Sequence, residues 1–119
     1  MRRSRLLKAC KRRMSKKGKR HTVNYILGHS QREVQRLIYQ AAILRPITER
    51  LLRSVKLESG MRVLDLGCGA GDVSMLVAEL VGSKGSVVGI DQNRDVLTLA
   101  AERARAAGLR QITACHRDS

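Results

Sequence analysis

An acid and three alternating glycines form the part of this sequence whose residue types are most suited to chemistry. They lie in the stretch VLDLGCGAGD and are Asp65, Gly67, Gly69 and Gly71. Glycine adopts backbone dihedrals closed to other residues and has no side chain that would keep a ligand away from the main chain. A second acid, Asp91, ends the run SVVGID twenty positions after Gly71. A carboxylate there can accept hydrogen bonds from both hydroxyls of a ribose, so we expect a nucleoside-containing ligand against bare backbone.

A βαβ unit is the local structure that would bring these residues together. Residues 61–66 have the short apolar pattern of a buried strand, and residues 86–91 form a second β-branched run. Between them, Val73, Leu76, Val77 and Leu80 recur at helical spacing. A further helix over residues 93–107 and a third strand over residues 110–115 continue the alternation. The order β-α-β-α-β predicts an α/β fold with about three parallel strands.

The residues before the first strand predict helices. Residues 30–45 show one apolar helical face, and Pro46 suits the first position of a second helix that would end near Val55. In that second helix Ile47, Leu51, Leu52 and Val55 are expected to point inward. Residues 21–59 are therefore predicted to be a helical cap that precedes the strand-containing part, residues 60–119.

The formal charge of +14 is concentrated at the N-terminus. Residues 1–20 hold eleven Lys or Arg and no acid, while the remaining residues hold thirteen basic and ten acidic side chains. So dense a run of like charge cannot offset the entropy of ordering, and we expect residues 1–20 to be a disordered basic arm. The arm could have a function, as a segment that binds phosphate or directs targeting. The alternative, which we favour, is a solvated tail without such a function.

Other chemistry is not indicated. The three cysteines form no CxxC pair and have no histidine at metal-ligand spacing, so no metal site is predicted. No apolar run approaches the roughly 18 residues that a membrane helix needs, and the basic start lacks the apolar core of a secretory signal. A cytoplasmic protein without membrane contact is the default expectation.

Two common glycine-rich loops do not fit the sequence. The dinucleotide fingerprint G-x-G-x-x-G requires a third glycine where Asp72 stands, which would place an acid near a pyrophosphate. The phosphate-binding loop G-x-x-x-x-G-K-[ST] fails on spacing and on its lysine. What remains is D-x-G-x-G-x-G followed by an acid that closes the next strand.

This combination closely resembles motifs one and two of the class I S-adenosylmethionine-dependent methyltransferases, especially those of ubiquinone and menaquinone biosynthesis. The resemblance rests on VLDLGCGAGD at residues 63–72 and GSVVGID at residues 85–91, and extends over about residues 25–119. It implies a Rossmann-like three-layer sandwich, of which this chain would hold the N-terminal half. It also implies S-adenosylmethionine as cofactor and methyl transfer to a small-molecule acceptor.

The resemblance also assigns cofactor-binding positions. They are Asp65, Gly67, Cys68, Gly69, Gly71, Asp91, Gln92 and Asp118. The glycine loop would run along the methionine part of the cofactor, and Asp65 would anchor the loop and help to orient the amino group. Asp91 would hold the ribose hydroxyls, Gln92 would flank the adenine and Asp118 would face its amino group. Cys68 is expected as a small loop residue and not as a nucleophile, and no catalytic residue can be named.

The complete fold of that family has seven strands in the order 3-2-1-4-5-7-6. The present sequence ends after the third strand, so we expect a fragment with weak cofactor affinity and little turnover by itself. The far edge of its first strand would be unpaired, which invites self-association. Two alternatives remain open: a non-catalytic module that binds RNA or an acidic surface through residues 1–20, and an NAD-binding domain.

Overall fold

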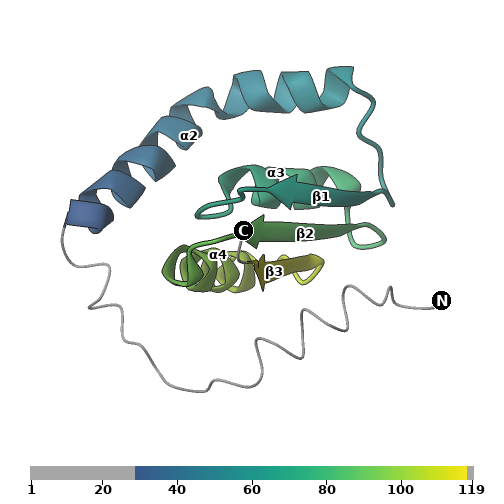
Figure 1. Cartoon of the computed structure of the whole chain (residues 1–119). Coiled ribbons are helices and arrows are strands. Elements are labelled where there is room, and N and C mark those ends of the chain that lie inside the picture. The colour runs from purple at the N-terminus through teal and green to yellow at the C-terminus, as the bar shows by residue number, and fades with distance from the viewer. Residues whose placement is uncertain (1–28, 118–119) are drawn as a thin grey trace.

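The structure, a computed structural model, describes residues 29–117. Its elements, shown in Figure 1, are α2 (His29–Ser54), β1 (Arg62–Leu66), α3 (Asp72–Val81), β2 (Ser86–Asp91), α4 (Arg94–Ala106) and β3 (Ile112–His116). The three predicted strands and the two helices between them are confirmed. The expectations for the basic arm and for Asp118 lie outside the described residues.

The three strands form one parallel sheet in the order β1-β2-β3. Parallel neighbours need crossover connections, which are almost always right-handed. Because both crossovers step in the same direction, α3 and α4 lie on the same face of the sheet, and Gly71 at the start of α3 lies against Ala100 of α4. The predicted α/β fold is confirmed, as the N-terminal half of a Rossmann-like sandwich.

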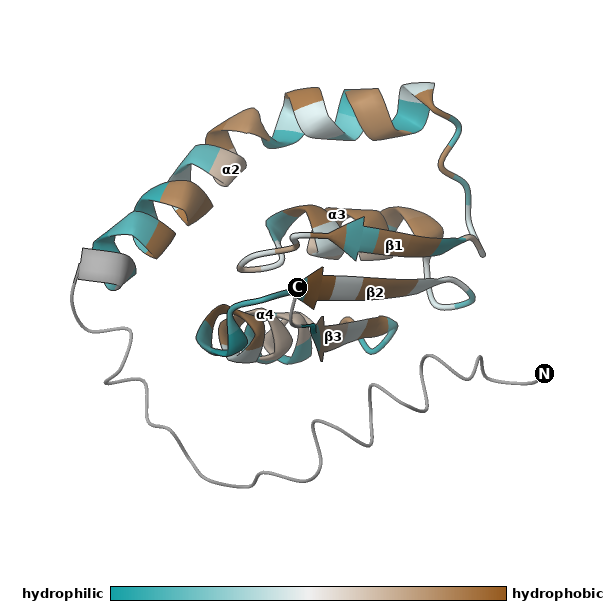
Figure 2. Cartoon of the chain, in the orientation of Figure 1, coloured by the Kyte–Doolittle hydropathy of each residue, from teal (hydrophilic) through white to brown (hydrophobic). Residues whose placement is uncertain are grey.

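The core lies between this sheet and α3. Val77, Ala78 and Val81 of α3 pack against Val87 of β2, and all four are at most 2% exposed. Leu52 of α2 packs against the edge of this cluster. Figure 2 shows that much of α3 and β2 is coloured as apolar. Burying one such aliphatic side chain contributes about 1.5–3 kcal/mol, so this cluster fixes the position of α3 relative to the strand ends.

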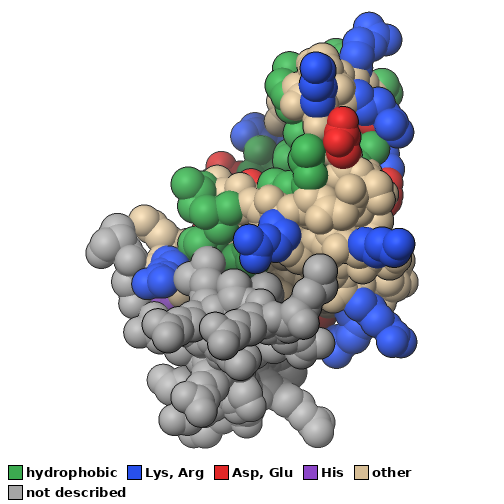
Figure 3. All heavy atoms as spheres, turned by 90° about the vertical axis from the view of Figure 1, so that its right-hand side faces the viewer, with side chains coloured by type: hydrophobic (Ala, Val, Ile, Leu, Met, Phe, Trp, Pro, Cys, Tyr) green, Lys and Arg blue, Asp and Glu red, His purple; other side chains and the backbone are tan. Residues whose placement is uncertain are grey.

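In the described part of the chain, the face of β1 that points away from α3 is open. Leu64 is 51% exposed and Leu66 is 73% exposed, and β1 has a pairing partner only on its β2 side. Hydrophobic side chains are visible at the surface in Figure 3, among scattered Lys and Arg. The expected unpaired edge of β1 is thus present, and Leu64 and Leu66 of the same strand are exposed on one face of the sheet.

The prediction of two helices around Pro46 is wrong. α2 is one helix of 26 residues with Pro46 inside it, and Figure 1 shows that it bends along its course. Proline has no N–H to donate to Ala42, so the helix loses one hydrogen bond and bends, a tolerable loss in an exposed helix. The inward placement of Ile47, Leu51 and Val55 is also wrong, since each is more than 60% exposed.

The reason for this exposure is that α2 touches the rest of the molecule mainly along one narrow stripe. Leu52 packs on the core, and Arg45 forms an ion pair with Glu79 of α3. The other apolar positions of the helix therefore have no surface to pack on. Neither α2 nor any other helix in this part of the chain is long and apolar enough to cross a membrane.

Candidate cofactor site

The loop between β1 and α3 contains three glycines in left-handed backbone conformations. Gly67, Gly69 and Gly71 have φ values of 72°, 55° and 87°. A Cβ at Gly67 or Gly69 would meet no atom within 4 Å, whereas a Cβ at Gly71 would lie 3.1 Å from the Cβ of Ala100. The first two glycines therefore border open space that a ligand can enter. The third is needed for close packing of the loop on α4.

Backbone hydrogen bonds attach the loop to the end of β2. The N–H groups of Gly67 and Cys68 both donate to the carbonyl of Ile90, at 2.7 and 3.0 Å. The N–H of Gly71 donates to the carbonyl of Cys68 at 3.0 Å, which closes the turn. The loop is consequently held at the carboxyl ends of β1 and β2, where ligands bind in open α/β sheets.

Asp91 at the end of β2 is bound directly to this loop. Its Oδ2 accepts a hydrogen bond from the Gly69 N–H at 2.9 Å, and its Oδ1 accepts one from the Asn93 N–H at 2.9 Å. A carboxylate has about four acceptor sites, so both oxygens keep capacity for a hydroxyl donor. The structure thus brings the predicted ribose acid and the glycine loop together.

Asp65 joins β1 to the first turn of α3. Its Oδ2 accepts a hydrogen bond of 2.6 Å from the hydroxyl of Ser74, which is 2% exposed. The carboxylate of Asp65 is therefore held in position by a buried donor. Sequence reasoning missed Ser74. The signal that could have identified it is a hydroxyl side chain two residues after the Gly-Asp pair that ends the loop.

The position after Asp91 connects β2 with β3. The carbonyl of Gln92 lies 2.9 Å from Nε2 of His116, and Gln92 itself is exposed. This link holds the ends of the two strands beside each other. The proposed adenine contact of the Gln92 side chain stays a prediction, as does that of Asp118.

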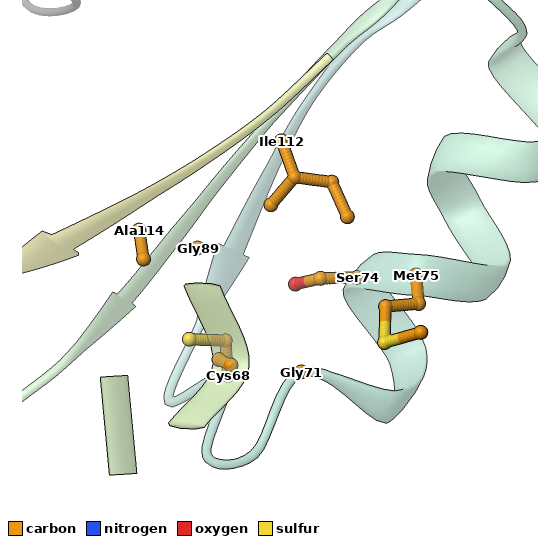
Figure 4. A pocket seen from close by; sticks show the side chains of 8 residues that line it. Cys68, Gly71, Ser74, Met75, Gly89, Ile112 and Ala114 are labelled. Carbon is orange, nitrogen blue, oxygen red and sulfur yellow. The ribbon is translucent and has the colours of Figure 1, made fainter. Parts of the chain in front are cut away.

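Cys68 lies at the base of the loop, beside a small apolar pocket between the sheet and α3. Figure 4 shows its side chain near Gly89 of β2, with Ser74 and Met75 reaching in from α3. Burial raises the pKa of the Cys68 thiol to about 11, and the negative charges of Asp65 and Asp91 act in the same direction. At neutral pH the group is a thiol, which is a poor nucleophile.

Arg103 of α4 contacts the other side of the loop. Its Nη1 donates to the carbonyl of Ala70 at 2.8 Å, and its Nη2 donates to Oδ1 of Asp72 at 2.8 Å. Sequence reasoning missed this residue, because an arginine in the last turn of a helix also fits the helix dipole at the surface. Within residues 29–117 there is no cluster of His, Cys, Asp and Glu suited to a metal ion.

Comparisons with known proteins agree with this geometry. The profile of a family described as "Methyltransferase domain" matches residues 57–119, more than half of the chain. The 2-phytyl-1,4-naphtoquinone methyltransferase of Synechococcus elongatus is 54% identical over 46 residues, which are 39% of this chain and 20% of that protein. The demethylmenaquinone methyltransferase of Geobacillus kaustophilus is 32% identical over 68 residues, which are 57% of this chain and 29% of that protein.

A solved structure gives the same result for the fold. The S-adenosylmethionine-dependent methyltransferase from Aquifex aeolicus superposes with a TM-score of 0.57 at 32% identity, over 60% of this chain and 38% of that one. The present chain therefore spans well under half of each protein that it resembles. The residues that the family profile matches include the glycine loop and Asp91 at the end of β2. The chain belongs to the class I S-adenosylmethionine-dependent methyltransferase family.

Proposed function

We propose that this chain binds S-adenosylmethionine between the glycine loop and Asp91. The observation that carries the proposal is the 2.9 Å hydrogen bond between the Gly69 N–H and Asp91, beside two glycines with open space at their Cβ positions. Bare backbone and a carboxylate in one place suit a ligand with a ribose and a cationic amino-acid part. The residues present fit the family's cofactor.

Each residue has a role that follows from its position. The remaining acceptor capacity of Asp91 receives the ribose hydroxyls, and the backbone at Gly67 and Gly69 borders the methionine part. Asp65, fixed by Ser74, contributes negative charge at the base of the loop, where it favours a cationic amino group. Gln92, exposed next to Asp91, flanks the adenine.

The reaction that we propose is methyl transfer to a small molecule. The bound cofactor supplies an electrophilic methyl group on a positively charged sulfur. The chain's own contribution is to hold that group in a fixed place, because proximity and orientation are the main needs of such a displacement. Quinones are the first acceptor class to test, since two relatives are named as naphthoquinone and menaquinone methyltransferases.

We further propose that the chain alone turns over slowly and associates with itself. Within residues 29–117 the assigned polar groups lie around the cofactor loop, and none can be assigned to an acceptor. The unpaired edge of β1, together with the exposed Leu64 and Leu66 on the same strand, favours association with a second copy. Association would appear as a concentration-dependent mass in light scattering.

Calorimetric titration of the full chain with S-adenosylhomocysteine tests the binding site. Asp91→Asn should raise the dissociation constant by about tenfold, since a hydrogen bond to a charged group contributes about 1.5 kcal/mol or more. Asp95→Asn is the matched control, because it removes the same charge four residues away on α4, and it should change affinity less than about twofold.

Two results would contradict the proposal. One is equal affinity of the wild type and Asp91→Asn for S-adenosylhomocysteine. The other is preferential binding of NAD in a competition titration, which would favour a dinucleotide site.

A further inference from the structure

We propose that Arg103 is the positioning residue of the glycine loop, holding it from α4 while Asp91 holds it from β2. The guanidinium donates to the Ala70 carbonyl, which lies within the loop, and to Asp72, the first residue of α3. One side chain thus joins the loop, α3 and α4. No contact between Arg103 and the cofactor is part of this inference.

The geometry of the contact is specific to arginine. Two different nitrogens, Nη1 and Nη2, each donate at 2.8 Å to acceptors that are two residues apart in sequence. The planar guanidinium has its donors in a fixed fork, whereas lysine presents one compact ammonium on a flexible chain. A lysine at this position therefore keeps the charge but does not reproduce the two fixed directions.

Partial burial makes this contact stronger than the other interhelical ion pair. The side chains of Arg103 and Asp72 are 25% and 24% exposed, against 49% and 44% for Arg45 and Glu79. Ion pairs in contact with solvent are screened and contribute little. The Arg103 contact is less screened, and one of its acceptors is a backbone carbonyl of the ligand-binding loop.

The loop depends on such a contact because glycine backbones have wide conformational freedom and little else restrains the far side of the loop. Its three glycines have positive φ, and the open space beside Gly67 and Gly69 means that no packing holds them. The described N–H bonds of the loop run to Ile90, Asp91 and Cys68. Arg103 is what holds the Ala70 carbonyl, and with it the orientation of the peptide between Ala70 and Gly71.

A purely structural role is the competing explanation, in which Arg103 only ties α3 to α4 through Asp72. The two explanations differ in the effect of Asp72→Asn. That substitution removes the ion pair but leaves Arg103 bonded to the Ala70 carbonyl. If Arg103 positions the loop, Asp72→Asn should have only a small effect on the loop. If its role is purely structural, Asp72→Asn should have the same effect as the loss of Arg103.

Amide hydrogen exchange of the ¹⁵N-labelled full chain, read at Gly69 and Gly71, tests the inference. Arg103→Gln should accelerate exchange at these amides by about tenfold, the factor that a charge-assisted hydrogen bond is worth. Asp72→Asn should accelerate it by about threefold or less, and Arg103→Lys should fall between Arg103→Gln and the wild type. The amide of Val77, in the core of α3, reports global opening in each variant.

Arg105→Gln is the matched control, because Arg105 is in the same last turn of α4, is exposed and carries the same charge. It should leave loop exchange within about twofold of wild type. Equal loop exchange in Arg103→Gln and Arg105→Gln would overturn the inference. So would an effect of Asp72→Asn as large as that of Arg103→Gln. If Arg103→Gln does not fold, the Arg103→Lys variant replaces it in the test. Exchange of the Gly69 and Gly71 amides at the wild-type rate in that variant would also overturn the inference.

The consequence for cofactor binding rests on the proposed function. If the loop is the binding surface, Arg103→Gln should raise the dissociation constant of S-adenosylhomocysteine by about fivefold, although Arg103 does not contact the ligand. Arg105→Gln should leave this constant unchanged. Absence of binding by the wild-type chain would refute the proposed function. The exchange measurement needs no ligand, so it would still decide the role of Arg103.

Discussion

Replacing Gly71 by alanine tests the packing of the loop against α4. Gly71 has a φ of 87°, and a Cβ there would lie 3.1 Å from the Cβ of Ala100. The left-handed conformation costs a residue with a side chain about 1–2 kcal/mol. Forcing an extra carbon into a packed contact costs about a further 1–3 kcal/mol. We therefore expect Gly71→Ala to lower the free energy of unfolding by about 2–4 kcal/mol after the unfolded-state gain of alanine over glycine is subtracted.

Gly60 supplies a control with the same backbone conformation. Its φ is also 87°, but a Cβ there would meet nothing within 4 Å. The conformational cost and the unfolded-state gain are shared by both substitutions, so the difference between them isolates the contact with Ala100. Urea unfolding followed by circular dichroism should show Gly71→Ala to be less stable than Gly60→Ala by about 1–3 kcal/mol.

Ala100→Gly completes the test as a double-mutant cycle. Alone it should cost about 1 kcal/mol, because glycine is a poor helix former. Combined with Gly71→Ala it should recover most of the contact penalty, with a coupling energy of about 1–3 kcal/mol. Equal destabilisation by Gly71→Ala and Gly60→Ala, or additive effects in the cycle, would refute the argument that close packing requires this glycine.

Three further predictions concern β2, the loop thiol and the β1 edge. Gly89→Ala should lower the free energy of unfolding by about 1–3 kcal/mol in urea, because its Cβ would lie 2.9 Å from Sγ of Cys68 and 3.2 Å from Oγ of Ser74; wild-type stability would show that the strand moves freely away from the loop. Alkylation of Cys68, mapped by mass spectrometry, should stay slow at pH 8 and rise toward pH 11, because the pKa of this thiol is raised to about 11. Since the folded state prefers the neutral thiol, the associated stability should be complete below pH 9 and decline between pH 9 and 11; fast labelling at pH 8 would contradict the burial argument. Leu66→Lys should leave thermal stability nearly unchanged, because this side chain is 73% exposed, and should reduce self-association in light scattering; unchanged association would exclude the β1 edge as the contact.

The pattern of the strands and of the helices between them was readable from the sequence. Strands of parallel sheets are short apolar runs, and the segments at 62–66 and 86–91 have that form with glycine or polar residues at their ends, although one face of the first is exposed. The position of Asp91 beside the glycine loop follows from the connection rule for βαβ units. The 2.9 Å contact with Gly69 agrees with that reasoning.

The features that were not predicted depend on contacts between segments distant in sequence. Pro46 marks a helix boundary in most sequences, but an exposed helix tolerates the loss of one hydrogen bond and continues. The outward positions of Ile47 and Leu51 depend on where α2 meets α3, which the apolar pattern of α2 does not contain. The links from Arg103 to the loop, thirty-one and thirty-three residues apart, likewise need the packed structure.

The strand order also bears on how the chain acquires its structure during synthesis. Among the described strands, β2 pairs with β1 and β3 pairs with β2, so each of these pairings joins a strand to the one made just before it. The entropic cost of closing the chain between neighbouring strands is smaller than for strands far apart in sequence. Assembly that begins at the N-terminal end, as residues leave the ribosome, is therefore favoured. The hydrogen bond from the Gly69 N–H to Asp91 spans only 22 positions, so both of its partners have been synthesised before Arg103 of α4.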